Sequence, residues 1–205
     1  MALLVPLSVP DTERTSTALA NVRQARDGAD RFIDNPSEAR DLLFEKNLGQ
    51  WDPSLNFVSR ADGYTAYLGS QELSLAFGQG VSVRMSYVDA NPRPIVTGVG
   101  DRLAKTHYLI GTGQKTWHPN VPSFKQVRYE GLYPGIDLLY SGKSGLIQYD
   151  FIVRPGYEAD VIKLRFDNET ELRLDSHGRL LMHTNGEKII FDAPLTVTDN
   201  NKNIY

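Results

Sequence analysis

The chain has 205 residues, of which 40% are hydrophobic and 23% are charged, as in an ordinary globular protein. Its net charge of −3 offers no general attraction to nucleic-acid phosphates or to anionic lipid, so we expect no nucleic-acid partner. The absence of cysteine excludes disulfides, thiolate metal sites and a cysteine nucleophile, and no apolar run reaches the roughly 18 residues of a membrane-spanning helix.

The first 43 residues differ from the rest of the chain. Residues 1–10 are apolar but short and lack a basic start, so a docking strand, an irregular start and a trimmed signal peptide all stay open. Asp11 can cap a helix, and Pro36 fits early in a second short helix that ends near Leu43. The apolar residues at helical spacing are Leu19, Val22, Ala25, Ala29, Phe32 and Ile33. We therefore expect a partly helical N-terminal arm over residues 1–43 that packs weakly.

From Phe44 onward the apolar residues recur at every second position, which predicts β-strands separated by turns rich in glycine and asparagine. The predicted strands cover residues 64–68, 72–77, 81–88, 127–129, 136–140, 146–153, 161–166, 172–175, 180–184 and 188–191. The connections are too short for the helical crossovers of a parallel sheet. The predicted fold is therefore mostly β, an antiparallel β-sandwich or meander with a short N-terminal helical arm.

Prolines mark the stretch between residues 91 and 122. Pro92, Pro94, Pro119 and Pro122 cannot donate a backbone hydrogen bond, so strands here are confined to sheet edges or strand ends. At the other end of the chain, apolar residues 204–205 follow a turn and look like the start of another strand. We therefore expect a β-rich domain over residues 44–205 that is truncated at its C-terminal end.

A series of motifs resembles one bacterial domain family. It begins with Phe44-Glu-Lys-Asn-Leu-Gly-Gln-Trp-Asp-Pro, and its strongest members are Val127-Arg-Tyr-Glu-Gly-Leu-Tyr-Pro-Gly-Ile-Asp-Leu-Leu-Tyr and Gln148-Tyr-Asp-Phe-Ile-Val-Arg-Pro-Gly. In order along residues 43–198, these motifs resemble the domain of unknown function that precedes SBBP (β-propeller type) repeats in secreted or surface proteins. The resemblance implies a noncatalytic, exported β-rich module without cofactors, located at the cell surface or secreted.

Three acidic residues are the candidate catalytic groups. Asp137 and Asp150 fall on adjacent predicted strands, with Glu130 near in sequence, and glycoside hydrolysis needs two carboxyl groups roughly 5–10 Å apart. The alternative is that Asp137 and Asp150 bond to loop amides or face solvent. Asp137 or Asp150 could also contribute to a Ca²⁺ site, but the sequence has no Asp-x-Asp-x-Asp-Gly loop, which is the usual sign of such a site. We expect no catalytic residue here, and a carbohydrate-active enzyme remains the second hypothesis.

Histidines and serines give no clear site. His177 and His183 fall in a predicted turn and strand, and neither they nor His107 and His118 show a zinc-ligand spacing, so we expect no metal site. Ser123, Ser141 and Ser144 lack a Gly-x-Ser-x-Gly elbow. Gly142-Lys-Ser-Gly145 lacks the spacing of a phosphate loop, so we interpret it as a hairpin turn.

Aromatic residues carry the remaining binding potential, since their rings combine apolar faces with polar tips. The candidates are Trp51, Trp117, Tyr64, Tyr67, Tyr129, Tyr133 and Tyr140. Trp117, in the proline-rich stretch, is the candidate ligand-binding residue, although ordinary packing in strands explains most tyrosines. We expect a protein or polysaccharide partner at the cell envelope, with roles in adhesion, scaffolding or capping of a longer β-rich chain. The third hypothesis is a glycan-binding module without hydrolysis.

Overall fold

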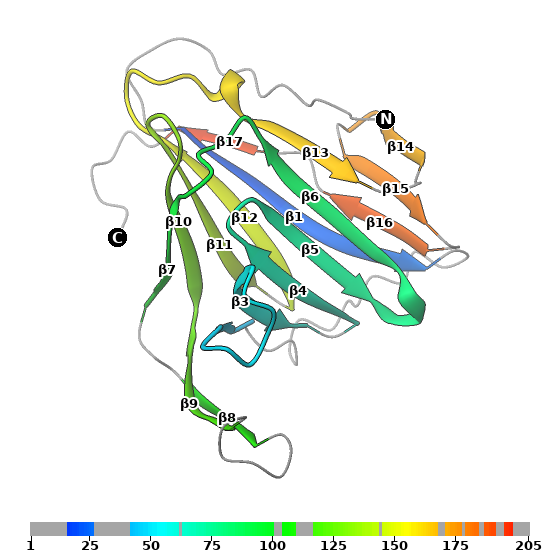
Figure 1. Cartoon of the computed structure of the whole chain (residues 1–205). Coiled ribbons are helices and arrows are strands. Elements are labelled where there is room, and N and C mark those ends of the chain that lie inside the picture. Colours follow the sequence, from blue (N-terminus) through cyan, green and yellow to red (C-terminus); the bar gives the residue numbers. More distant parts are fainter. Residues whose placement is uncertain are drawn as a thin grey trace.

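A computed structural model gives the architecture of the chain as two facing β-sheets (Figure 1). The structure describes residues 16–26, 42–61, 63–100, 104–109, 117–143, 145–167, 171–177, 179–184, 187–191 and 195–198. Among these residues, two short 3-10 turns, Gly78–Gly80 and Ala159–Val161, accompany the strands. Every strand pairing of the described residues is antiparallel, which confirms the predicted fold class.

The first sheet has nine strands, in the order β14-β15-β16-β1-β12-β11-β10-β7, with β17 also pairing with β1. The strands that share this sheet are β1 (Ser16–Arg26), β7 (Ile95–Val99), β10 (Gln126–Tyr133), β11 (Ile136–Lys143), β12 (Leu146–Val153), β14 (Glu171–Leu174), β15 (Leu180–Thr184), β16 (Glu187–Phe191) and β17 (Leu195–Thr198). Hairpins of adjacent strands build most of it. β7 and β1 are exceptions: β7 pairs with β10 across the intervening β8 and β9, and the partners of β1 lie more than a hundred residues away in the chain.

The second sheet has eight strands, in the order β13-β6-β5-β4-β3-β2-β9-β8. They are β2 (Phe44–Lys46), β3 (Leu55–Arg60), β4 (Tyr64–Gly69), β5 (Glu72–Phe77), β6 (Ser82–Val88), β8 (Ala104–Leu109), β9 (Trp117–Phe124) and β13 (Lys163–Asp167). In Figure 1 the β8–β9 hairpin extends away from the rest of the sheet. β9 continues into β10, so the chain passes from one sheet to the other at Lys125.

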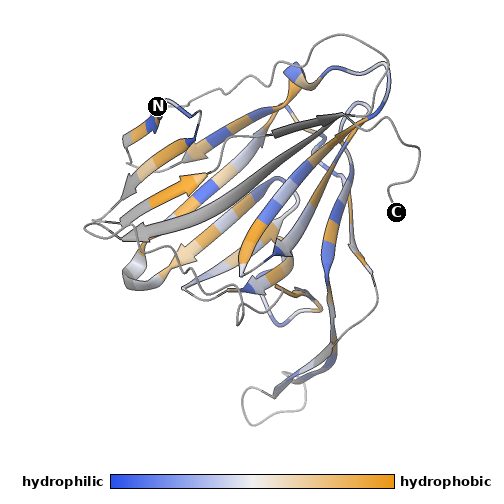
Figure 2. Ribbon diagram, turned by 180° about the vertical axis from the view of Figure 1, so that it is seen from behind, coloured by the Kyte–Doolittle hydropathy of each residue, from blue (hydrophilic) through white to orange (hydrophobic). Residues whose placement is uncertain are grey.

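The hydrophobic core lies between the two sheets, where alternate residues of each strand point inward. Figure 2 shows the matching alternation of hydrophobic and hydrophilic residues along the strands. Phe44, Phe57 and Met85 from the second sheet and Leu138 and Phe151 from the first are all at most 1% exposed. Burial of this apolar surface is the main force that holds the sheets together.

Tyrosine hydroxyls connect the sheets inside this core. The Tyr87 and Tyr140 hydroxyl oxygens lie 2.6 Å apart, and the Tyr129 hydroxyl donates to the Gly69 carbonyl at 2.8 Å. The Ile147 N–H donates to the Tyr64 hydroxyl oxygen at 2.8 Å. Each pair joins one sheet to the other, so the buried hydroxyls fix how the sheets are placed while their rings fill the core.

Most predicted strands are confirmed. Residues 72–77, 146–153 and 180–184 match β5, β12 and β15 at both ends, and the remaining predicted strands match within a few residues. β11 and β12 pair as a hairpin, as predicted, with Gly142 and Lys143 at the end of β11 and Lys143 opposite Leu146 in register. Likewise His177 lies in the β14–β15 turn and His183 on β15, as expected.

The predicted N-terminal helix is wrong over Ser16–Arg26, which form β1. Its apolar residues fit a helical spacing, but the segment pairs along its length with β12, β16 and β17, and these long-range backbone bonds outweigh a weak local preference. Residues 42–43 have no regular structure. The rest of the predicted arm, residues 1–15 and 27–41, and the predicted terminal strand at 204–205 lie outside the described residues.

Prolines behave as predicted in the 91–122 stretch. β7 follows Pro94 and is an edge strand, as is β8. β9 contains Pro119 and Pro122, but its described register with β2 involves only Ser123 and Phe124. Both prolines therefore lie where β9 pairs with β8 alone among the described strands.

Candidate functional site

A polar loop presents Trp51 on the outside of the sandwich, between β2 and β3. The Asn47 side chain donates to the carbonyls of Asp52 at 2.8 Å and Leu55 at 2.9 Å. Its Oδ1 accepts the N–H groups of Gly49 at 3.0 Å and Trp51 at 3.2 Å. One asparagine thus satisfies both ends of the loop, which fixes the backbone at Trp51.

The sheet register places a strip of side chains beside this loop on the outer face. Glu45 lies opposite Val58, and Val58 lies opposite Tyr67, so these three residues share one side of β2, β3 and β4. Arg60, two residues beyond Val58, belongs to the same side. Val58 is fully buried although it faces away from the main core, so the surrounding side chains cover this strip.

Five residues form an outer-face cluster: Glu45, Trp51, Arg60, Tyr67 and Tyr108. The Arg60 guanidinium carbon lies 5.2 Å from the Trp51 ring centroid and 5.7 Å from the Tyr108 ring centroid, within the range of cation–π attraction. Trp51 meets Tyr67 edge-on at 6.3 Å and Tyr108 at 5.8 Å between centroids. The guanidinium therefore sits among aromatic rings outside the main core.

Charge and hydrogen bonding complete the cluster. Arg60 forms an ion pair with Glu45 at 3.2 Å and donates to the Tyr108 hydroxyl at 2.9 Å, while that hydroxyl donates to Glu45. Burial and the Glu45 carboxylate raise the pKa of Tyr108, so its phenol stays protonated. The Trp51 indole N–H is buried without a partner. The Arg60 side chain remains 46% exposed, so a partner can reach the guanidinium.

Asp137 is held by arginines. Its side chain is 1% exposed and accepts from Arg128 at 2.5 Å, from the Gly131 N–H at 2.8 Å and from Arg154 at 3.4 Å. Burial alone would raise its pKa, but the bonds from Arg128 and Gly131 outweigh burial and hold the pKa of Asp137 below its ordinary value. This carboxylate fixes the β-bulge of β10, between Tyr129 and Tyr133, against β11.

Asp150 differs from Asp137 although both lie on the same face of adjacent strands. Asp137 is opposite Ile152 in register and Asp150 is opposite Leu139. Burial raises the pKa of Asp150 to about 6, and its Oδ1 is buried without a hydrogen-bond partner. Glu130 is exposed on β10, opposite Ile95. The structure therefore places Asp137 and Asp150 on one face of the sheet, but the Asp137 carboxylate is already paired with Arg128 and Arg154.

Histidines do not assemble a metal centre in the part of the chain that the structure describes, where no group of three potential ligands from His, Cys, Asp and Glu comes together. His107, on β8, accepts the Asn120 N–H at 3.3 Å. His177 and Arg179 both contact Asp175 in the β14–β15 turn. No described helix is both long enough and apolar enough to cross a bilayer.

The aromatic candidates divide between the core and the surface. Tyr64, Tyr129, Tyr133 and Tyr140 are buried between the sheets and serve packing. Trp51 and Tyr67 belong to the outer-face cluster. Trp117 begins β9, with its backbone opposite Leu109, and its side chain lies outside the described part of the structure.

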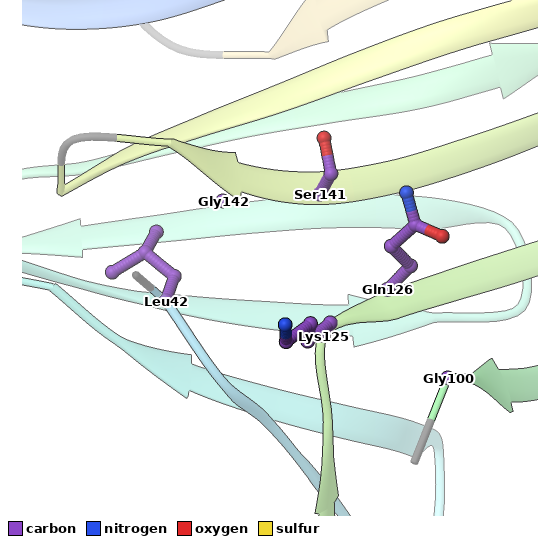
Figure 3. Close-up of a pocket in the computed structure, with 6 residues that line it drawn as sticks. All are labelled: Leu42, Gly100, Lys125, Gln126, Ser141 and Gly142. Carbon is purple, nitrogen blue, oxygen red and sulfur yellow. The ribbon is translucent and has the colours of Figure 1, made fainter. Parts of the chain in front are cut away.

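A cavity of about 280 Å³ opens at the corner where β9 turns into β10 (Figure 3). Its lining residues are Leu42, Gly100, Lys125, Gln126, Ser141 and Gly142. Leu42 packs on the bare Gly142 backbone, where an added Cβ would lie 2.3 Å from the Leu42 Cβ. Lys125 is the one charged residue among these six. They therefore supply the cavity with neither an acid–base pair nor a carboxylate that could bind a metal ion.

Sequence reasoning named Trp51 and Tyr67 but missed Glu45, Arg60 and Tyr108. These residues come from β2, β3 and β8, which only the fold brings together. One signal was available: Glu45 and Arg60 carry opposite charges on either side of the turn-rich loop around Trp51. Opposite charges on neighbouring strands of one sheet face often pair.

Comparison with known proteins gives one family and no individual relative. The domain of unknown function DUF7948 matches residues 44–204. No curated protein and no solved structure matches the chain. The matched segment covers most of the 205 residues and every described strand except β1. The chain therefore belongs to the DUF7948 family.

Proposed function

We propose that this chain is a noncatalytic β-sandwich module of a bacterial secreted or cell-surface protein, and that it binds a protein or polysaccharide at the cell envelope. Its roles would be adhesion, scaffolding or capping of a longer β-rich chain. The motif series that resembles the domain found ahead of SBBP repeats supports this setting. The observation that carries the binding role is the outer-face cluster, with Arg60 half-exposed against the Trp51 and Tyr108 rings.

The cluster has the chemistry of a recognition surface. Tyrosine, tryptophan and arginine are the residues that dominate binding energy in interfaces, because they bury large area and keep polar tips. The Trp51 indole N–H is buried without a hydrogen-bond partner among the described residues, so a ligand reaches it only when the side chains that cover it shift. An acceptor oxygen that reached this group would satisfy a donor whose burial costs about 1–3 kcal/mol. Sugar hydroxyls and peptide carbonyls both supply such oxygens.

Binding to an array of envelope polysaccharides and surface proteins tests the proposal. We expect saturable binding that Arg60→Ala weakens at least tenfold. Arg84→Ala is the matched control, because Arg84 also pairs with a glutamate on the outer face, Glu72 at 3.5 Å, and its side chain is 56% exposed. Thermal unfolding of both variants separates lost binding from lost folding.

Two results would overturn this assignment. The first is no saturable binding across the array. The second is equal binding by wild type, Arg60→Ala and Arg84→Ala. Trp117→Ala is tested in parallel, because Trp117 is the sequence-based candidate: loss of binding in that variant alone would move the binding surface to the β8–β9 hairpin.

A carbohydrate-active enzyme is the second candidate, favoured by one observation. Burial raises the pKa of Asp150 to about 6, as suits a general acid, and Asp150 shares a face with Asp137. The arginines that hold Asp137 argue for a structural role of that partner. Release of reducing ends from polysaccharides, abolished by Asp150→Asn, would support the enzyme, whereas no release across a broad panel would exclude it.

A further inference from the structure

β1 occupies the middle of the nine-stranded sheet. One edge of the strand pairs with β12 along Ser16–Asn21, and the other edge pairs with β17 along Ser16–Leu19 and with β16 along Val22–Arg26. Figure 1 shows β1 lying between β12 on one edge and β16 and β17 on the other. Among the described strand pairings, β1 alone joins β14, β15 and β16 to the rest of the sheet.

The same strand lies outside the matched family domain, which starts at residue 44. The family domain thus supplies the strands on both sides of β1, and the segment before the domain supplies β1 itself. We call the position in the sheet between β12 and the strands β16 and β17 the slot of β1. Residues 27–41 connect Arg26 to Leu42, and a connection of this length can reach roughly 50 Å when extended. By its number of residues alone, this connection is long enough for the strand to fill either its own slot or that of a neighbouring molecule.

Backbone pairing is what holds β1. Every residue from Ser16 to Arg26 has a partner across at least one edge. Ala18 and Ala20 lie opposite Phe151 and Tyr149 in register, so the smallest strand residues occur where the neighbouring strand carries large buried rings. These determinants are identical whichever copy of the chain provides the strand.

We propose that β1 is an exchangeable strand, and that residues 16–26 of one copy fill the slot between β12 and β16 of a second copy. The partner is therefore another molecule of this same chain. The exchange keeps all pairings of the closed form and changes only which copy contributes them. It would link modules at the cell envelope without a new interface.

Cysteine pairs test the exchange directly, because the chain has no cysteine of its own. Asn21 and Gln148 are directly opposite across β1 and β12. Directly opposed antiparallel residues have Cα atoms about 4.5–5.5 Å apart, which suits a disulfide. Full-length Asn21→Cys and Gln148→Cys are unfolded, mixed, refolded together and oxidised. We expect a disulfide-linked dimer of twice the 22.9 kDa chain mass, joined between positions 21 and 148 by peptide mapping.

Two controls make each outcome decisive. Asn21→Cys mixed with Ser74→Cys, on β5 of the other sheet, gives the level of random cross-linking. The double variant Asn21→Cys/Gln148→Cys checks the register within one chain. If the double variant closes internally but the mixed single variants do not exceed the Ser74→Cys level, β1 stays in its own chain and the proposal is overturned. If the double variant forms no 21–148 disulfide, either within one chain or between two, the register of β1 on β12 is wrong and the proposal is overturned as well.

Discussion

The hydroxyl oxygens of Tyr87 and Tyr140 lie 2.6 Å apart at the centre of the sandwich, one on each sheet. Both side chains are almost completely buried, so neither hydroxyl has water as an alternative partner. Burial raises the pKa of both groups well above the ordinary tyrosine value, and they remain neutral donors and acceptors. The pair therefore couples the placement of β6 to that of β11.

Tyr140→Phe should destabilise the protein by about 1–3 kcal/mol, because it leaves the Tyr87 hydroxyl buried without this partner. Tyr87→Phe/Tyr140→Phe should recover part of the loss, since it removes both polar groups. Urea unfolding of wild type, both single variants and the double variant gives the coupling free energy. A coupling free energy of zero would contradict the role assigned to this pair.

Asp137→Asn should lower the free energy of unfolding at pH 7 by about 2–3 kcal/mol, because Arg128 and Arg154 lose their anionic partner while staying half-exposed to water. The folded pKa of Asp137 is lowered, so its contribution is present above the ordinary value of 3.8 and is lost as pH falls through the folded pKa. Urea unfolding at pH 7 and pH 3 should therefore show the difference shrinking in acid. Asp160→Asn, at an exposed aspartate, is the control and should be neutral.

Asp150 should have the opposite pH dependence. Its folded pKa is raised from 3.8 to about 6, so the folded state binds the proton more tightly than the unfolded state. The contribution of Asp150 to stability therefore falls as pH rises from about 4 to about 6 and then levels off. Asp150→Asn should exceed wild type by about 1–2 kcal/mol at pH 7.5, allowing for partial exposure, and lose this advantage at pH 4. A constant difference between pH 4 and pH 7.5 would rule out this account of Asp150.

Gly98→Ala should destabilise the sandwich by about 1–3 kcal/mol, because the added Cβ would lie 2.3 Å from Cγ of the Phe124 ring. Phe124 also meets Phe57 edge-on at 5.9 Å, so the ring cannot move freely. Gly78→Ala is the matched control, since no atom lies within 4 Å of its added Cβ. Chemical denaturation of the two variants compares them, and equal midpoints would refute the close packing of β7 on β9.

Local patterns predicted the strands whose alternation and turns are self-contained. β5 and β12 alternate buried and partly buried residues along their whole length, and each has a short connection to a neighbouring strand. β1 could not be predicted in this way, because the decision between helix and strand depends on partners such as Asp150 and Ile190 that lie far along the chain. Its alanine-rich sequence has little strand preference of its own.

The candidate site was only partly predictable for the same reason. Trp51 was recognisable as an aromatic residue with binding potential. Arg60 meets it only once β2 and β3 pair, and Tyr108 only after β8 folds beside β9. For Tyr129 and Tyr140 the sequence favoured ordinary packing but left ligand stacking open, and the structure buries both rings in the core. A strand pattern alone leaves open which sheet face becomes the core.

Amide hydrogen exchange of the native protein tests most directly whether the N-terminal segment completes the sheet. The account predicts that amides of residues 16–26 that bond to β12, β16 or β17 exchange as slowly as those of β12, because a central strand opens only when the sheet opens. Exchange of residues 16–26 at the rate of an unstructured peptide, with β12 still protected, would contradict the central position of β1.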